Sequence, residues 1–215
     1  MTRVDEAVAL QVALAPSVIR TGPVGFTPRI VAGLDVAYGA GGDRVAAAVA
    51  CVDLTTLSVV DHAVVLDVAE FPYVPGLFAF RELPPLLKAL AELGSAPDLL
   101  VCDGQGLAHP RRFGLACHAG VVTGLPSIGV GKQALGRYDP PGPDRGDWTD
   151  LTDGGEVVGR ALRTQAGVKP VFVSIGHRID LDLATEVVLR LSPRFRLPEA
   201  IRAADRLGRQ ALRSA

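Results

Sequence analysis

Residues 29–68 read RIVAGLDVAYGAGGDRVAAAVACVDLTTLSVVDHAVVLDV. Three runs in this stretch are rich in valine, alanine and other apolar residues, and turn residues at 39–43 and 55–56 separate them. Apolar runs of this length between turn signals are typical of β-strands, and short connections join antiparallel neighbours. The stretch therefore predicts an antiparallel meander whose strands cover 29–39, 44–54 and 58–68.

Helices and further strands alternate after the meander. Leucines recur at helical spacing in residues 83–93, so we expect a helix that begins near Glu82 and holds Pro84 and Pro85 in its first turn. Other apolar runs predict an N-terminal helix over 6–15, strands over 98–104, 126–131, 156–164 and 169–176, and helices over 114–124, 180–191 and 198–213. This order predicts a ribonuclease H-like α/β fold, in which helices flank a mixed β-sheet, formed by a single domain over 1–215.

Residues 139–154, DPPGPDRGDWTDLTDG, contain five aspartates and no apolar periodicity. Segments of this composition are typical of surface connections. We expect an exposed acidic loop here.

The composition is that of a globular chain. Of 215 residues, 48% are hydrophobic and 21% are charged, which excludes disordered, collagen-like and coiled-coil classes. The formal net charge of −1 gives no global attraction to a polyanion, so any such partner must be met locally. Asp5 and Glu6 stand where a signal peptide needs basic residues, and the first apolar run is too short to span a bilayer. We expect a cytoplasmic protein with no membrane contact, whose three cysteines are buried and unpaired.

Two aspartates lie at positions that make them candidate site residues. Asp35 interrupts an apolar strand, and burying an unpaired carboxylate is unfavourable unless it is hydrogen-bonded or holds a cation. Asp103 follows a buried strand and precedes Gly104-Gln105-Gly106, at the strand end where open α/β sheets bind ligands. A strand-edge aspartate and a turn aspartate are the structural alternatives, and both stay open.

The segment before Glu82 gathers aromatic and proline residues. Phe71, Tyr73, Phe78 and Phe80 precede the carboxylate closely, among the prolines of PYVPG. These aromatic rings either pack as a hydrophobic staple against the following helix or form a rigid wedge that stacks on nucleic-acid bases.

Several basic groups are candidate phosphate contacts. Lys132 ends an apolar strand, but GVGK lacks the spacing of a phosphate-binding P-loop, and a solvated lysine is the alternative. His109 lies beside Arg111 and Arg112, and His177 lies between an expected strand and helix. Residues 190–213 carry seven arginines against two acidic residues, which fits either a phosphate-binding flank or a solvated helix face.

Together these motifs resemble the endonuclease V family of deoxyinosine-specific repair nucleases. The resemblance rests on PYVPGLFAFRE, DGQGLAHPRRFGLACHAG, GVGK and KPVFVSIGHRIDLD, and it runs from about Gly33 to Asp205. It implies a deoxyribonuclease V-type endonuclease, a phosphodiester hydrolase that initiates DNA repair. Such an enzyme cleaves the second phosphodiester bond on the 3′ side of deoxyinosine in DNA and leaves a 5′-phosphate end. The implied cofactor is Mg²⁺, with Mn²⁺ as a substitute, and the implied partner is deoxyinosine-containing DNA bound by a monomer.

The resemblance also implies roles for particular residues. Asp35, Glu82 and Asp103 would bind the metal, and Lys132 and His177 would complete the catalytic set. A strand-separating wedge would comprise Pro72, Tyr73, Val74 and Pro75, and a pocket for the extruded base would be lined by Gly76, Phe78, Gly104 and His109. Gly131 stands where the family more often has alanine, and Ala200-Ile201 replace a usual Pro-Thr.

Three other functions remain open. An inosine-specific endoribonuclease would share the same site, and another ribonuclease H-like nuclease would share the carboxylates but not need the wedge. A non-catalytic binding module is the third, but clustering three carboxylates without a cation is unfavourable, which argues against it.

Overall fold

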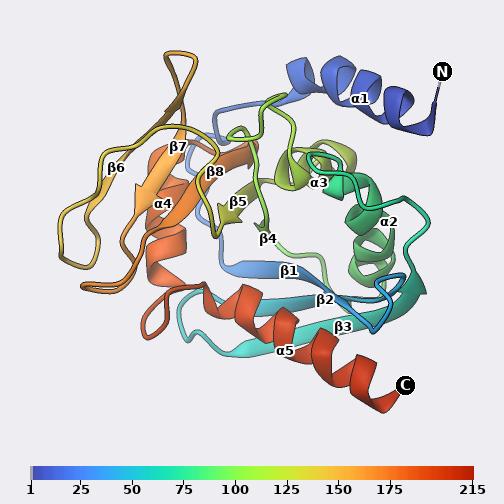
Figure 1. The fold of residues 1–215 in the computed structure, drawn as a ribbon. Helices are drawn as coiled ribbons and strands as arrows, with labels where there is room; N and C mark the ends of the chain where they lie inside the picture. The colour runs from blue at the N-terminus through green and yellow to red at the C-terminus, as the bar shows by residue number, and fades with distance from the viewer. Residues whose placement is uncertain (1) are drawn as a thin grey trace.

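The structure is a computed structural model that describes residues 2–215. Its centre is an eight-stranded sheet in the order β3-β2-β1-β4-β5-β8-β7-β6 (Figure 1). The strands are β1 (Ile30–Tyr38), β2 (Arg44–Asp53), β3 (Val59–Val68), β4 (Leu99–Asp103), β5 (Ser127–Gly131), β6 (Trp148–Asp153), β7 (Glu156–Leu162) and β8 (Val171–His177). The helices are α1 (Arg3–Leu14), α2 (Phe78–Ala91), α3 (Leu115–Thr123), α4 (Leu181–Arg190) and α5 (Glu199–Ser214), and a short 3₁₀ turn covers Ala15–Ser17.

Strand pairing follows the sequence pattern closely. β1, β2 and β3 pair antiparallel, so the predicted meander is confirmed. β4 lies parallel to β1 and β5 lies parallel to β4, with helices α2 and α3 in the connections that parallel strands require. β8 returns antiparallel to β5, and β7 and β6 continue antiparallel from it. The sheet is mixed and ribonuclease H-like, as predicted.

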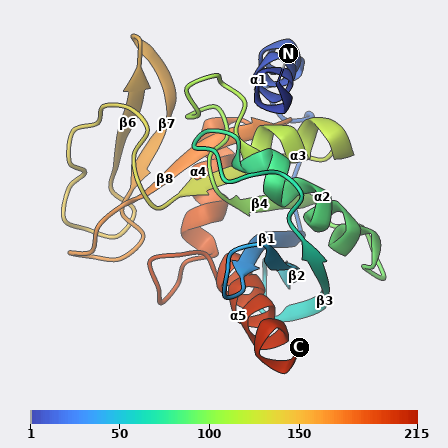
Figure 2. The same ribbon diagram turned by 45° about the vertical axis from the view of Figure 1, so that its right-hand side comes forward.

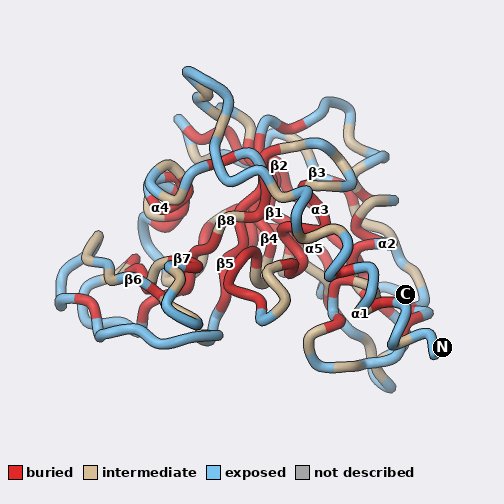
Figure 3. Tube along the Cα trace, turned by 90° about the horizontal axis from the view of Figure 1, so that it is seen from above, coloured by how far each residue is buried: buried red, intermediate tan, exposed pale blue. Residues whose placement is uncertain are grey.

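Helices cover both faces of the sheet. Figure 2 shows strands β1 to β3 lying between α5 and α2. Residues alternate between the two layers: Val31 and Val101 pack toward α4 and α5, whereas Leu34 and Leu100 pack toward α2 and α3. The central strands are consequently buried while the outer connections are exposed (Figure 3).

Helix α2 begins earlier than the sequence suggested. Its first residue is Phe78, so Glu82 lies within the helix and Pro84 and Pro85 lie beyond the first turn. These prolines supply no N–H groups to the preceding turn. Leu83 and Leu86 on the sheet-facing side are buried and hold the helix together across this gap.

The expected acidic loop is wrong for residues 148–153, which form edge strand β6. A single apolar residue, Leu151, is fully buried against Phe172 and its neighbours, too little to produce a periodic pattern. Gly154 and Gly155 both have positive φ and make the two-residue hairpin turn to β7.

The remaining expectations from composition concern cysteines and membranes. Cys51, Cys102 and Cys117 are buried free thiols, as predicted. Within residues 2–215, no helix combines the length and apolar character needed to cross a membrane.

Candidate active site

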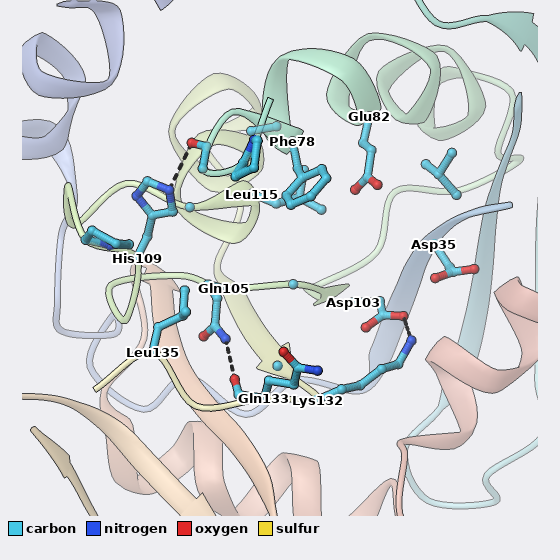
Figure 4. A pocket seen from close by; sticks show the side chains of 18 of the residues that line it. Asp35, Phe78, Glu82, Asp103, Gln105, His109, Leu115, Lys132, Gln133 and Leu135 are labelled. Carbon is cyan, nitrogen blue, oxygen red and sulfur yellow. Dashed lines mark hydrogen bonds and ion pairs between the residues drawn. The ribbon is translucent and has the colours of Figure 1, made fainter. Parts of the chain in front are cut away.

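Three carboxylates face one cavity, where the paired part of β1 and β4 ends. Val31 lies beside Leu99 and Gly33 beside Val101, and the same parallel offset carried two residues further places Asp35 beside Asp103. Both side chains face the α5 layer, because residues two apart share a face of a strand. Glu82 reaches the same space from α2, as Figure 4 shows.

These carboxylates line one large cavity. Its volume is about 1120 Å³, and its walls include Asp35, Glu82, Asp103 and Lys132. A cavity of this size at the carboxyl ends of sheet strands is the usual position of an α/β binding site. The structure therefore brings together four of the five predicted catalytic residues.

Burial changes the protonation of two of the acids. Burial raises the pKa of Asp35 to about 8, and a hydrogen bond with Asp103 and the charge of that group add to the rise. Burial likewise raises the pKa of Glu82 to about 7, although a hydrogen bond from Tyr38 opposes the rise. Without a bound cation, the protein therefore does not keep all of these carboxylates fully ionised near pH 7.

Two of the three acids have a hydrogen-bond partner outside the carboxylate group. Lys132 Nζ donates to Asp103 Oδ2, and the Tyr38 hydroxyl donates to Glu82 Oε1 over 2.9 Å. Among residues 2–215, no three histidine, cysteine, aspartate or glutamate side chains lie close enough together to form a ready-made metal-binding group.

The donor set nevertheless fits a hard divalent cation. Every candidate ligand is a carboxylate oxygen, which is the donor that Mg²⁺ and Mn²⁺ prefer. The raised pKa values of Asp35 and Glu82 mark carboxylates that an added positive charge would stabilise in ionised form. Asp35, Glu82 and Asp103 are the residues placed to hold such an ion.

A fourth carboxylate escaped the sequence analysis. Asp205 on α5 lines the same cavity, and its negative charge contributes to the raised pKa of Asp35. Arg209, one turn further on, donates to Asp205 over 2.6 Å. In the sequence Asp205 borders the buried face of α5, which includes Ile201, Ala204 and Gly208, and this is the one signal that could have singled it out.

His177, which the sequence placed in the catalytic set, does not line this cavity. β8 runs antiparallel to β5, and the register pairs His177 with Ser127 at the start of β5, whereas Lys132 follows the other end. The buried imidazole accepts a hydrogen bond from the Ile19 backbone N–H over 3.2 Å. Burial, and then the charge of Arg178, lower its pKa, so it serves as a neutral anchor for the chain that enters β1.

The aromatic segment before Glu82 divides between the two alternatives. The rings of Phe71 and Phe80 lie 5.6 Å apart and belong to the packing around α1 and α2, as in a staple. The Tyr73 ring packs edge-on against Phe78 at 4.9 Å and is 68% exposed. An exposed, proline-flanked ring beside the cavity has the position that a wedge requires.

The four residues of the predicted base pocket belong to the same cavity as the aspartates. Gly76, Phe78, Gly104 and His109 all line it. Burial, together with the charge of Arg111, lowers the pKa of His109 to about 4, so its imidazole is neutral near pH 7. His118, by contrast, packs between Phe80 and Phe113 and does not line the cavity.

The basic groups of the sequence are mostly used inside the protein. Arg112 makes ion pairs with Asp153 and Glu156 at 2.9 and 2.8 Å, and Arg111 turns toward α1. Arg196 donates to the carbonyl oxygens of Lys132, Lys169 and Pro170. Within the stretch 190–213, Arg196 is therefore held by the protein's own carbonyl groups and is not a free phosphate contact.

A ribonuclease H-like sheet with carboxylates and a lysine at one edge of its central strands is an arrangement suited to phosphodiester cleavage. Comparison with known proteins gives the family. Residues 12–206 match the family model of endonuclease V. An endonuclease V from Nocardia farcinica is 56% identical over 214 residues, covering 100% of this chain and 95% of the relative. The chain belongs to the endonuclease V family and is an endonuclease.

Solved structures agree with this assignment. The crystal structure of endonuclease V from Streptomyces avermitilis has a TM-score of 0.92 and 52% identity, covering 99% of this chain and 94% of that one. Endonuclease V from Ciona intestinalis, in complex with DNA containing an inosine followed by a ribo-adenosine, has a TM-score of 0.88 and 25% identity and covers 100% of this chain and 99% of that one.

Proposed function

We propose that this endonuclease recognises deoxyinosine, the product of adenine deamination, in DNA and hydrolyses the second phosphodiester bond on its 3′ side, which initiates repair. The observation that carries the proposal is the cavity itself. It joins a carboxylate cluster to a pocket beside an exposed tyrosine, so one nucleotide can enter the pocket while a neighbouring phosphate meets the acids. The inosine-containing DNA held by the Ciona relative supports the same substrate.

The acids supply the binding site for the metal. Asp35, Glu82 and Asp103 would hold Mg²⁺, or Mn²⁺ in its place, and Asp205 lies close enough to add a further carboxylate. When bound, the ion supplies Lewis-acid activation of the scissile phosphate and of the attacking water. Lys132, freed from Asp103, places its ammonium where charge develops on the phosphate. Cleavage on the 3′-oxygen side of the phosphorus leaves a 5′-phosphate on the downstream fragment.

The pocket side supplies recognition of the base. Tyr73, braced by Pro72 and Pro75, would fill the gap left in the duplex when the base is extruded. The extruded hypoxanthine would lie against Phe78 and the backbone of Gly76 and Gly104. A neutral His109 limits the charge in this pocket, which suits an uncharged base.

A second candidate is cleavage of inosine-containing RNA. The Ciona complexes contain a ribo-adenosine directly after the inosine, which favours a site that accepts a ribose at the neighbouring position. The cytoplasmic location and monomeric state expected from the sequence stay predictions.

End-labelled DNA with a single deoxyinosine tests the proposal, with Mg²⁺, with Mn²⁺ and with EDTA. We expect a metal-dependent cut between the first and second nucleotides 3′ to the inosine. Asp35→Asn should abolish the cut, whereas Asp150→Asn, an exposed aspartate on β6, should leave it unchanged. Cleavage of inosine RNA alone would select the second candidate, and silence on both substrates would refute a nuclease specific for inosine.

A further inference from the structure

One backbone carbonyl group between the wedge and α2 accepts hydrogen bonds from three side chains. The Gly76 oxygen accepts hydrogen bonds from Gln11 Nε2 at 3.2 Å, His109 Nε2 at 3.0 Å and Arg111 Nη2 at 2.7 Å. Gly76 directly follows the segment 72–75 and has a φ of 79°, a conformation that disfavours other residues. Side chains from two distant parts of the sequence thus converge on the turn that carries the wedge. We call these three side chains the Gly76 clamp.

Gln11 links the clamp to the N-terminal helix. Its side chain projects from α1, and the residue is only 1% exposed. Besides Gly76, its Nε2 donates to the Phe113 carbonyl over 3.0 Å, and its Oε1 accepts from Arg111 Nε over 2.6 Å. Both ends of the amide are therefore occupied, and they join the wedge turn to the loop that follows β4. Leaving such a buried group without partners is unfavourable, which makes this arrangement specific.

The hydrogen bonds of His109 and Arg111, the other two members of the clamp, show which nitrogen of His109 carries the proton. The backbone N–H of Arg111 donates to His109 Nδ1 over 3.2 Å, so the neutral His109 carries its proton on Nε2 and donates it to Gly76. Within residues 2–215, Arg111 forms no ion pair with a carboxylate, so its guanidinium is directed to Gln11 and Gly76. Figure 4 shows His109 turned toward this carbonyl at one end of the cavity.

The surroundings of the clamp place it in the recognition half of the site. Gln11, Gly76, His109 and Arg111 all line the cavity, whereas the carboxylates lie at its other end. α1 packs beside the same turn, with Ala7 buried against Phe71 and Leu77. The helix therefore contacts the base of the wedge through both apolar packing and the clamp.

We propose that Gln11 is a positioning residue for base recognition. By holding the Gly76 turn against the loop after β4, it fixes the spacing between the wedge and the pocket into which the base is extruded. The inference rests on the proposed function, since it assigns α1 a role in the discrimination of hypoxanthine from undamaged bases. A displacement of about 1 Å in such a site is enough for a large loss of efficiency.

Three variants separate positioning from packing. Gln11→Met keeps the length of the side chain and removes its hydrogen bonds. Gln11→Glu keeps the acceptor for Arg111 but turns a carboxylate oxygen toward the carbonyls of Gly76 and Phe113. Gln210→Met, an exposed glutamine on α5, is the matched control for the same chemical change.

Hydrogen exchange of the free protein tests the clamp without any substrate. The amides of Leu77 and Phe80 donate to the carbonyls of Val74 and Leu77 within this turn. In Gln11→Met we expect residues 74–80 to exchange about tenfold faster, while the central strands keep wild-type protection. Gln11→Glu should show a larger increase, because it adds repulsion to the loss. Wild-type exchange in both variants, or faster exchange throughout the protein, would overturn the proposal.

Steady-state kinetics on deoxyinosine DNA tests the consequence for recognition. Because the carboxylates are left intact, Gln11→Met should raise KM by about tenfold or more and change kcat far less. Its preference for deoxyinosine over an undamaged duplex should fall in the same proportion. A fall in kcat with unchanged KM and preference would refute positioning of the base. Failure of the proposed function is distinguishable, because the wild-type protein would then not cut deoxyinosine DNA at all, and local exchange would still decide whether Gln11 holds the turn.

Discussion

Replacing Tyr38 with phenylalanine removes one hydroxyl group from the active site. That hydroxyl donates to Glu82 Oε1 over 2.9 Å, and burial together with the charge of Glu82 raises the pKa of Tyr38, so it stays protonated. A hydrogen bond to an ionised group contributes about 1.5–3 kcal/mol, and the lower value applies because Tyr38 is 40% exposed. This corresponds to about tenfold in a binding constant. We therefore expect Tyr38→Phe to weaken Mg²⁺ binding by about tenfold, as for other groups that orient metal ligands.

Isothermal titration of the protein with Mg²⁺ and Mn²⁺ measures this effect directly. Tyr138→Phe is a matched control, since Tyr138 is 38% exposed and its ring packs edge-on against Phe172 at 5.0 Å, on another part of the protein. In a Glu82→Gln background the Tyr38 substitution should have little further effect, because the charge that the hydroxyl supports is gone. An unchanged or tighter Kd in Tyr38→Phe would refute the reasoning.

Three further predictions concern stability, the pocket and the wedge. Burial lowers the pKa of His118 to about 4, against 6.5 in the unfolded chain, so unfolding takes up a proton between these values. The contribution of His118 to the free energy of unfolding should therefore be complete above pH 6.5 and fall toward pH 4 by up to about 1.4 kcal/mol per pH unit. Urea unfolding of His118→Phe should show a shallower pH dependence than the wild type. An identical pH dependence would contradict this. Gly131→Ala adds a methyl group that overlaps the side chain of Gln105, which lines the cavity, so Gln105 must move. We expect a raised KM for deoxyinosine DNA, and wild-type kinetics would show that the position of Gln105 does not affect substrate binding. Tyr73→Ala should reduce cleavage of a deoxyinosine duplex by about tenfold to hundredfold, as expected for loss of base stacking, and leave the affinity for Mg²⁺ unchanged. Full activity of this variant on every inosine substrate would count against the wedge.

Local sequence patterns were sufficient to predict most strands of the sheet. The meander and the strands β4 and β5 are apolar runs bounded by turn residues, and their neighbours in space are also neighbours in the sequence. Asp35 and Asp103 could be recognised for the same reason, since each carboxylate interrupts or ends a buried strand. Such signals are short-range and survive without knowledge of the tertiary structure.

The two errors in secondary structure have a common cause. The start of α2 and the strand β6 are set by packing that the local sequence does not encode. α2 begins at Phe78 although Pro84 and Pro85 favour a later start, because Leu83 and Leu86 gain burial against the sheet. β6 contains a single buried residue, Leu151, and exists because β7 offers it an edge to pair with.

The composition of the active site depends on strand direction, which sequence pattern does not reveal. His177 and Asp103 both end a buried strand that is followed by a turn and a helix, so the same local signal marks both. β4 runs parallel to β1, however, and β8 runs antiparallel to β5, so only Asp103 arrives at the end of the sheet where Asp35 lies. Asp205 is the converse case: it lies in a helix among arginines, and it reaches the cavity because α5 packs across β1 with its small residues Ala204 and Gly208 buried. Where a fold mixes parallel and antiparallel strands, a polar residue at a strand end is therefore a site candidate only once the direction of that strand is known. A helix that crosses the central strands can also supply a site residue, and only its packing reveals which one.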